Sequence, residues 1–281
     1  IKQILINFKG FLMAFKLVTL DSKGNQLIDD ANSNYWNNEA LEKKKAFNVI
    51  DLGFDKIESS FKYNSLLESV TQITKKYEIE FKNAKILSIA SGTCWIESQL
   101  FKDNQFQTLT NVDISRHRIH KLAPYTMEHY GINGDVSFLY GSVFDMKTEN
   151  NKYDVILLSQ AFHHMEEPIR LLRYMKNLLN KDVFIVIVGE HFYSNYEYHK
   201  RAIKHFIKYL INYKNYAKLR NFYHAWQYLF QPDYDKGDIH WSASEYDFLF
   251  RKSGFQIYHH DVHSSKLFQS FVLSYGENYA Q

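Results

Sequence analysis

The stretch Ala84-Lys-Ile-Leu-Ser-Ile-Ala-Ser-Gly-Thr-Cys94 decides the fold of this chain. Its apolar part, residues 84–90, is too short for a typical helix and ends in Ser91-Gly92, so it predicts a buried strand that turns sharply. Residues 63–77, just before it, have apolar side chains at helical spacing and predict a helix. Small residues after a strand let the backbone pass close to a ligand, and the next helix points its free N–H groups toward that ligand.

Strands and helices alternate from this stretch onward. Continuous apolar strands separated by amphipathic helices are typical of a parallel sheet covered on both faces, and right-handed crossovers make it doubly wound. The last two strands are joined by residues 263–266 only, too short a link for a parallel crossover, so we expect an antiparallel hairpin. The sequence therefore predicts an α/β fold with a doubly wound, mostly parallel seven-stranded sheet that ends in this hairpin. The further strands are predicted at 109–114, 136–141, 153–159, 183–189, 255–262 and 267–275, and the further helices at 115–130, 168–179 and 242–253.

Composition bounds the class of protein. The chain has 281 residues, 45% of them hydrophobic, which is enough for a sizeable core. A formal charge of +3 gives no support for a nucleic-acid partner. The single cysteine, Cys94, fits a reducing compartment. The apolar stretch 4–20 is interrupted by Lys9 and Lys16 and has no cleavage site of a secretory signal, so we expect a cytoplasmic protein.

An acid follows the second predicted strand at the spacing that a nucleoside ligand requires. Asp113 ends that strand 21 positions after Gly92. In open α/β sheets ligands bind beyond the carboxyl ends of the strands, and an acid about 20 residues after the glycine turn binds ribose hydroxyls. We therefore expect the loop after residue 89 and the carboxylate of Asp113 to hold an adenosine together.

Four segments resemble the motifs of the class I S-adenosylmethionine-dependent methyltransferases. They are residues 85–100, Asn111-Val-Asp-Ile-Ser115, Leu139-Tyr-Gly-Ser-Val-Phe-Asp145 and residues 153–164. With the terminal hairpin, the resemblance covers residues 83–189 and 242–281. It implies S-adenosylmethionine as cofactor and S-adenosylhomocysteine as product. It also implies that Ala90, Ser91, Gly92, Thr93 and Cys94 border the methionine and ribose parts, that Asp113 holds the ribose hydroxyls, that Ile114 packs on adenine, that Ser142 and Val143 face the adenine amino edge, and that Ser159 and Gln160 lie beside the sulfonium.

The chain departs from this family pattern at four positions. Ser88 stands where the family has an acid, Ala90 and Cys94 replace two glycines, and Ser142 replaces an aspartate. Ala and Cys are small, so we expect the loop to form with negative φ angles at both residues. Loss of the acid at Ser88 leads to the hypothesis of weaker cofactor affinity or a compensating acid from the N-terminal segment.

Two other function classes compete with a methyltransferase. The first is a catalytically inactive relative that serves as a binding or scaffold module, which the degenerate first motif favours. The second is a nicotinamide-dependent oxidoreductase. The absence of a Gly-x-Gly-x-x-Gly pattern and the predicted terminal hairpin both argue against the second.

Methyl transfer needs alignment of donor and acceptor, and a general base if the acceptor is a hydroxyl or a protonated amine. Histidine suits that role near neutral pH. Of the histidines at the predicted rim of the pocket, we take His164 first and His240 second as the catalytic base, and His191, Tyr193 and Trp241 as substrate contacts. The clusters at 163–167 and 259–263 lack a recognised metal-ligand spacing, so we expect no metal.

The chain divides into a core with two additions. We expect an N-terminal helical cap at 1–82, in which Asn34-Tyr-Trp36 folds over the cofactor, a core at 83–190 and 242–281, and a helical lid at 191–241. Residues 198–232 contain no acid, and an apolar helical stripe there has a basic opposite face. That face is either simply solvated, recruits an anionic acceptor such as a phosphorylated or sugar-linked metabolite, or, less favoured, binds a membrane surface. A monomer and a homodimer both stay open.

Overall fold

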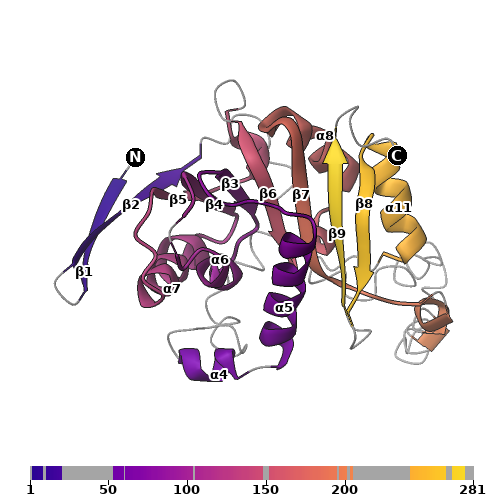
Figure 1. The fold of residues 1–281 in the computed structure, drawn as a ribbon, viewed down its shortest axis with the longest axis horizontal. Coiled ribbons are helices and arrows are strands. Elements are labelled where there is room, and N and C mark those ends of the chain that lie inside the picture. Colours follow the sequence, from indigo (N-terminus) through magenta and orange to yellow (C-terminus); the bar gives the residue numbers. More distant parts are fainter. Residues whose placement is uncertain are drawn as a thin grey trace, which may run out of the picture.

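Strands β3 (Lys85–Ile89) and β6 (Tyr153–Ser159) are neighbours at the centre of a mixed sheet (Figure 1). The structure is a computed structural model that describes residues 2–8, 11–20, 53–59, 61–103, 105–147, 152–194, 196–200, 203–204, 241–263 and 268–275. Strands formed by these residues make a nine-stranded sheet in the order β1-β2-β5-β4-β3-β6-β7-β9-β8. The other strands are β1 (Lys2–Phe8), β2 (Phe11–Thr19), β4 (Thr108–Asp113), β5 (Val136–Tyr140), β7 (Leu179–His191), β8 (Gln256–Val262) and β9 (Phe268–Tyr275).

The helices that connect the strands agree with the periodicity of the sequence. The predicted helix 115–130 forms as a π-helical turn that continues into an α-helix. No helix among the described residues is both long and apolar enough to cross a bilayer. The helical elements are α4 (Phe54–Glu58), α5 (Phe61–Lys76), α6 (Trp95–Leu100), η1 (Arg118–Leu122), α7 (Ala123–His129), η2 (Val143–Asp145), η3 (Phe162–His164), α8 (Pro168–Leu178) and α11 (Ala243–Lys252).

The central strands are parallel, as their continuous apolar sequences predict. In β3, Ile86 is paired with Leu109 of β4 on one side and with Val155 of β6 on the other. The chain runs from β3 outward to β4 and β5 and then returns to β6 on the opposite side of β3. The strand order therefore reverses between β3 and β6. In open α/β sheets, ligands bind at such a reversal, beyond the carboxyl ends of the strands.

The predicted C-terminal hairpin is confirmed. Strand β9 pairs antiparallel with both β7 and β8, so it lies between them. Helix α11, which leads into the hairpin, begins with a capping box. The Ser242 hydroxyl accepts a hydrogen bond from the Glu245 amide, and the Glu245 carboxylate accepts one from the Ser242 amide. The sheet is thus the α/β Rossmann-like arrangement, mostly parallel with antiparallel C-terminal strands.

The N-terminal part departs from the prediction of a helical cap. Strands β1 and β2 form an antiparallel hairpin, and β2 pairs parallel with β5, so the sheet has two strands more than the predicted seven (Figure 1). The physical reason is that β5 offers an open edge to an apolar segment, and Leu17 pairs there with Phe138. Helices α4 and α5 do lie within the predicted cap region. Residues 34–36, which we expect to fold over the cofactor, lie outside the described residues.

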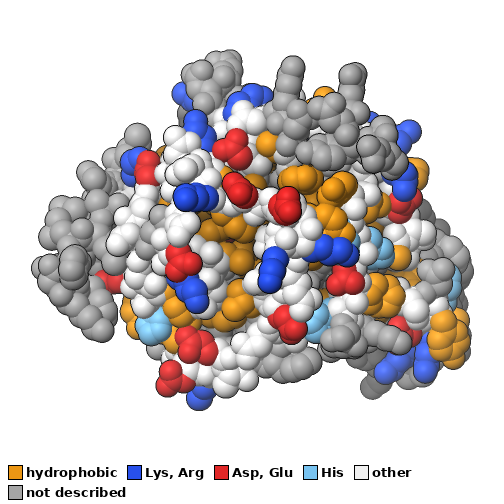
Figure 2. All heavy atoms as spheres, viewed as in Figure 1, with side chains coloured by type: hydrophobic (Ala, Val, Ile, Leu, Met, Phe, Trp, Pro, Cys, Tyr) orange, Lys and Arg blue, Asp and Glu red, His pale blue; other side chains and the backbone are white. Residues whose placement is uncertain are grey.

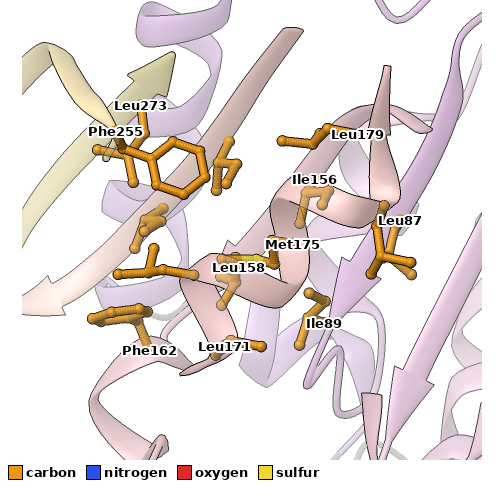
Figure 3. Packing of buried hydrophobic residues seen from close by; sticks show 14 of the residues in the cluster. Leu87, Ile89, Ile156, Leu158, Phe162, Leu171, Met175, Leu179, Phe255 and Leu273 are labelled. Carbon is orange, nitrogen blue, oxygen red and sulfur yellow. The ribbon is translucent and has the colours of Figure 1, made fainter. Parts of the chain in front are cut away.

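Helices cover both faces of the sheet. Leu171 and Met175 of α8 and Phe250 of α11 pack on one face, in the cluster that also contains Phe162 (Figure 3). Helix α5 packs on the other face, where Val70 is fully buried. Each such buried side chain contributes roughly 1.5–3 kcal/mol. On the face seen in Figure 2, acidic and basic side chains of the described residues alternate without a large patch of one sign.

Candidate active site

The loop after β3 has a strained backbone. Ala90, Gly92 and Cys94 all have positive φ angles, of 52°, 56° and 57°. The expectation of negative φ at Ala90 and Cys94 is therefore wrong. These two residues adopt the left-handed conformation that glycine takes without strain, at the positions where the resembling family has glycine. Strain of this kind persists where the surrounding structure imposes it and gathers at ligand sites.

Asp113 joins the end of β4 to this loop. Its carboxylate accepts a hydrogen bond from the Gly92 amide at 2.8 Å and another from the Ser115 amide at 2.7 Å. The side chain is 8% exposed, so a small part of it reaches the surface at the carboxyl edge of the sheet. The orientation of the carboxylate is thus fixed by backbone groups on both sides.

The residues predicted to face adenine lie beside Asp113, on the neighbouring strand. Asp113 pairs with Tyr140 at the end of β5, and the Gly141 amide donates to the Asp113 carbonyl at 3.1 Å. Ser142 then caps η2, where its hydroxyl accepts from the Phe144 amide. The structure therefore brings Ile114, Ser142 and Val143 to the same edge as the loop.

Ser159 ends β6, next to β3, and Gln160 follows it directly. Gln160 has a φ of 52°, and its amide donates to the Val188 carbonyl at 2.8 Å. Its side chain lies over Gly189, because a Cβ added at Gly189 would be 2.8 Å from Gln160 Cγ. The sequence-predicted cofactor residues therefore gather at the carboxyl ends of four adjacent strands, β5, β4, β3 and β6.

A buried carboxyl lies under the loop, at a position that the sequence did not indicate. The fully buried Ser88 hydroxyl donates to Glu97 Oε1 at 2.5 Å. Glu97 lies in the first turn of α6 and is 1% exposed. Burial raises the pKa of Glu97 to about 7, and the nearby Asp113 charge adds to the rise. Among the described residues, the carboxyl that contacts position 88 thus comes from α6, and the hypothesis of an acid from the N-terminal segment stays a hypothesis.

A second buried carboxylate, Glu190, binds the turn that follows β6. It lies in β7 with no exposed surface. It accepts hydrogen bonds from the backbone amides of Ala161, Phe162 and His163 at 3.2, 3.0 and 3.0 Å. The His163 ring (Nδ1, 2.9 Å) and the Tyr246 hydroxyl (3.0 Å) bond to it as well. Although burial alone would raise the pKa of Glu190, the His163 ring and these hydrogen bonds lower it.

Histidine rings cluster around this carboxylate. The centroid of the His163 ring lies 4.1 Å from that of His164 and 4.7 Å from that of His191. Tyr193 follows, with its ring centroid 6.1 Å from that of His191. His164 and His191 are half-buried, whereas His163 is only 4% exposed. The predicted base His164 and the predicted substrate contacts His191 and Tyr193 therefore lie together at the ends of β6 and β7.

The remaining acceptor-side predictions have different outcomes. Trp241 directly precedes α11 and packs against the core cluster that includes Phe162 and Tyr246. Its indole Nε1 is buried and makes no hydrogen bond to the part of the chain that the structure describes. His240 lies outside the described residues, so its predicted role stays a prediction. No group of three His, Cys, Asp or Glu side chains is arranged to hold a metal ion within the described ranges.

The sequence did not predict a role for Glu97 or Glu190, nor the hydrogen bond of the His163 ring to Glu190. A signal existed for Glu190, because an acid that ends a continuous apolar strand, 183–189, must find buried donors. For Glu97 the signal was weaker. The contact with Ser88 depends on how the loop folds α6 back onto β3.

Comparisons with known proteins agree with this geometry. Residues 62–260, well over half of the chain, match the family described as "Methyltransferase domain". No curated protein matches the sequence. Likeness to solved structures is a likeness of fold, at identities of 11–17% in the three cases that follow.

The magnesium protoporphyrin IX methyltransferase of Synechocystis PCC 6803, solved with bound SAH, has 11% identity and a TM-score of 0.54, covering 86% of this chain and 95% of that one. The plantazolicin methyltransferase BpumL, in complex with a pentazolic desmethylPZN analog and SAH, has 17% identity and a TM-score of 0.54, with 88% of this chain and 95% of that one covered. A putative O-methyltransferase from Nostoc punctiforme PCC 73102 has 16% identity and a TM-score of 0.53, with 86% and 68% covered. These likenesses agree with the fold, and the family match over residues 62–260 shows that the chain belongs to the class I S-adenosylmethionine-dependent methyltransferase family.

Proposed function

We propose that this protein transfers the methyl group of S-adenosylmethionine to a hydroxyl or amine of a small-molecule acceptor. The observation that carries the proposal is the bond between Asp113 and the Gly92 amide, at 2.8 Å, beside a loop held in the left-handed conformation. A fixed carboxylate next to an exposed loop backbone is the arrangement that binds a ribose and its neighbouring groups.

The residues present fit this cofactor. Among the described residues, Arg118 Nη1 is the one atom within 4 Å of a Cβ built at Gly92, at 3.7 Å, so a ligand can approach the backbone closely there. The buried Ser91 hydroxyl makes no hydrogen bond to an oxygen or nitrogen of the described residues, and its hydrogen-bond partner is the Cys94 thiol. In this proposal Asp113 binds the ribose hydroxyls. Ala90, Ser91, Gly92, Thr93 and Cys94 border the ribose and methionine parts, Ile114, Ser142 and Val143 surround adenine, and Ser159 and Gln160 lie beside the sulfonium.

The bound cofactor supplies an activated methyl group, so the protein has to align the acceptor and remove its proton. His164 accepts that proton in our proposal. Glu190 supports this role, because it bonds three successive backbone amides of the turn that carries His164 and also the ring of His163 packed against it. His191, Tyr193 and Trp241 contact the acceptor.

We also propose that the chain consists of a core, a lid and a cap. The core comprises residues 83–190 and 242–281, residues 191–241 form a lid over the acceptor, and residues 1–82 form a cap whose strands β1 and β2 join the sheet. The basic stretch of the lid, which would favour an anionic, phosphorylated or sugar-linked acceptor, lies almost entirely outside the described residues. The proposal of an anionic acceptor is therefore based on the amino-acid sequence of the lid alone.

Titration calorimetry with S-adenosylmethionine, followed by transfer of a tritiated methyl group, tests the proposal. The labelled cofactor is incubated with the protein and an ultrafiltered metabolite extract, and in parallel with protein and nucleic-acid fractions. We expect binding, and label in the small-molecule fraction. No binding would instead support a scaffold role, and label in a macromolecular fraction would refute a small-molecule acceptor.

A pair of variants tests the proposed base. His164→Gln should lower turnover by roughly two orders of magnitude or more, as loss of a general base does, with cofactor affinity nearly unchanged. His259→Gln is the matched control, because His259 lies on the edge strand β8 and bonds Tyr77 at 2.6 Å, away from the site. Equal turnover in the two variants would remove His164 from the mechanism.

A further inference from the structure

Glu97 is a buried acid, and none of the described groups that shift its pKa is a cation. Its carboxyl accepts a hydrogen bond from the Ser88 hydroxyl and interacts electrostatically with the Cys94 thiol and the Asp113 carboxylate. Helices α5 and α7 also contact α6, and the Trp95 indole at the start of α6 donates to the Tyr130 hydroxyl directly after α7 at 3.2 Å. Placing a charge in such surroundings is costly unless a positive group neutralises it.

The position of Glu97 indicates where such a positive group would come from. Ser88 lies in β3, directly before the left-handed loop, and Glu97 follows the loop in the first turn of α6. The two ends of the loop are therefore joined by this hydrogen bond. In the proposed binding mode adenine lies at β5 and the ribose at β4, so the amino-acid part of the cofactor extends over β3, the strand that contains Ser88.

We propose that Glu97 recognises the ammonium group of the cofactor, and that cofactor binding ionises its carboxyl. The proton balance is simple: the neutral carboxylic acid releases one proton to solvent, and the resulting carboxylate faces the ammonium cation. This inference rests on the proposed cofactor site. It explains how the chain tolerates serine at position 88, because the missing acid is supplied nine residues later.

Linkage gives the expected pH dependence. Burial raises the pKa of Glu97 in the free protein to about 7. A cation favours the ionised form and lowers that pKa in the complex, so protons are released on binding below pH 7. Affinity therefore increases as pH rises toward 7 and is constant above it.

The experiment uses S-adenosylhomocysteine as probe, because it carries the ammonium and does not react. Its dissociation constant should fall about tenfold or more between pH 5.5 and 8, since one linked proton changes affinity by up to about tenfold per pH unit. 5′-Methylthioadenosine, which lacks the ammonium, should bind with pH-independent affinity. Calorimetry in buffers of different ionisation enthalpy should show proton release for the first ligand only.

Variants separate this role from a structural one. Glu97→Gln should remove the pH dependence and weaken binding of S-adenosylhomocysteine at pH 8. Glu128→Gln is the matched control, a mostly buried acid on α7 whose pKa is also raised by burial. The double variant Ser88→Asp, Glu97→Ser should restore affinity at pH 8 by moving the acid back to β3.

Two results would overturn the inference. One is an unchanged pH profile in Glu97→Gln, and the other is the same profile for 5′-methylthioadenosine as for S-adenosylhomocysteine. Failure of the wild type to bind either ligand at any pH would count against the cofactor site itself, so the two failures are distinguishable. Proton release is measured on the wild type, which keeps the test valid if a variant does not fold.

Discussion

The Asp113 carboxylate holds the Gly92 amide at 2.8 Å, so the end of one strand controls the shape of the loop that follows its neighbour. The same carboxylate bonds the Ser115 amide at the start of the next helical segment. Three consecutive parts of the cofactor site are thus coupled through one side chain. A change at Asp113 should affect stability and cofactor binding together.

Asp113→Asn tests this coupling. The amide nitrogen of Asn would oppose a backbone N–H, and we expect the free energy of unfolding to fall by about 1–3 kcal/mol, the usual result of leaving a buried donor unpaired. Cofactor affinity should fall in parallel. Urea unfolding and calorimetry measure the two effects. Asp135→Asn, which breaks an exposed ion pair with Lys16, should cost less than about 1 kcal/mol and leave affinity unchanged.

Ala90→Gly should stabilise the protein. Ala90 has a φ of 52°, where a Cβ costs about 1–2 kcal/mol, and removing it outweighs the added freedom of glycine in the unfolded chain. We expect a gain of about 0.5–1 kcal/mol in urea unfolding. Ala161→Gly is the control, since Ala161 has a φ of −130° and gains nothing from glycine. Destabilisation by both substitutions would contradict the strain.

Gly189→Ala isolates a steric effect. A Cβ at Gly189 would lie 2.4 Å from Leu66 Cδ1, whereas a Cβ at Gly131 would have no atom of the described part of the chain within 4 Å. Both glycines have nearly equal φ angles, 74° and 73°. Gly131→Ala should therefore cost only the backbone term of about 1 kcal/mol, and Gly189→Ala should cost a further 1–3 kcal/mol or so from overpacking. Thermal unfolding of both variants gives the difference in stability between them. No difference would mean that α5, which contains Leu66, shifts to make room for the added Cβ.

Glu190→Gln should destabilise the protein by about 3 kcal/mol, because a neutral amide cannot serve five donors. The pKa of Glu190 is lowered in the folded state, so its contribution is present above the unfolded pKa and is lost as pH falls below it. The variant should accordingly lose stability less steeply on acidification. Glu167→Gln, at an exposed pair with Arg170, is the control and should behave like the wild type.

The pKa of Glu97 is shifted in the opposite direction to that of Glu190, so its effect on stability has the opposite pH dependence. Its folded pKa of about 7 exceeds the ordinary 4.5, so the folded protein binds the proton more tightly than the unfolded chain. The free energy of unfolding should then fall as pH rises from 4.5 to 7, by up to about 3 kcal/mol at roughly 1.4 kcal/mol per pKa unit. Glu97→Gln removes this loss. Without cofactor it should be more stable than the wild type at pH 8 and similar at pH 5, as measured by urea unfolding.

Much of the fold was predictable because its signals are local. The apolar run 84–90 and the short link 263–266 determine the strand type and the hairpin without knowledge of distant contacts, and both expectations were confirmed. Strands β1 and β2 were missed because the partner of β2 is a distant strand. Lys16 contacts Asp135, 119 positions away, and no local pattern reports such a partner.

The site also has residues that the sequence predicts and residues that it does not. Asp113 was identifiable from its spacing to Gly92, whereas the pairing of Glu97 with Ser88 requires the three-dimensional course of the loop. The expected negative φ angles at Ala90 and Cys94 are wrong because a small side chain does not by itself give a residue ordinary backbone geometry. The glycines that the resembling family has at those positions were the better guide to the backbone conformation.

The pairing of β2 with β5 also has a consequence for how the protein is made. More than a hundred residues, including those of β3 and β4, are synthesised between Lys16 and its contact Asp135. During that interval an apolar hairpin has no sheet to join, and such unpaired strands are prone to aggregate. Docking of the hairpin closes a contact of long sequence separation, a type of step that slows folding, so chaperones would be most useful to the nascent chain at this stage.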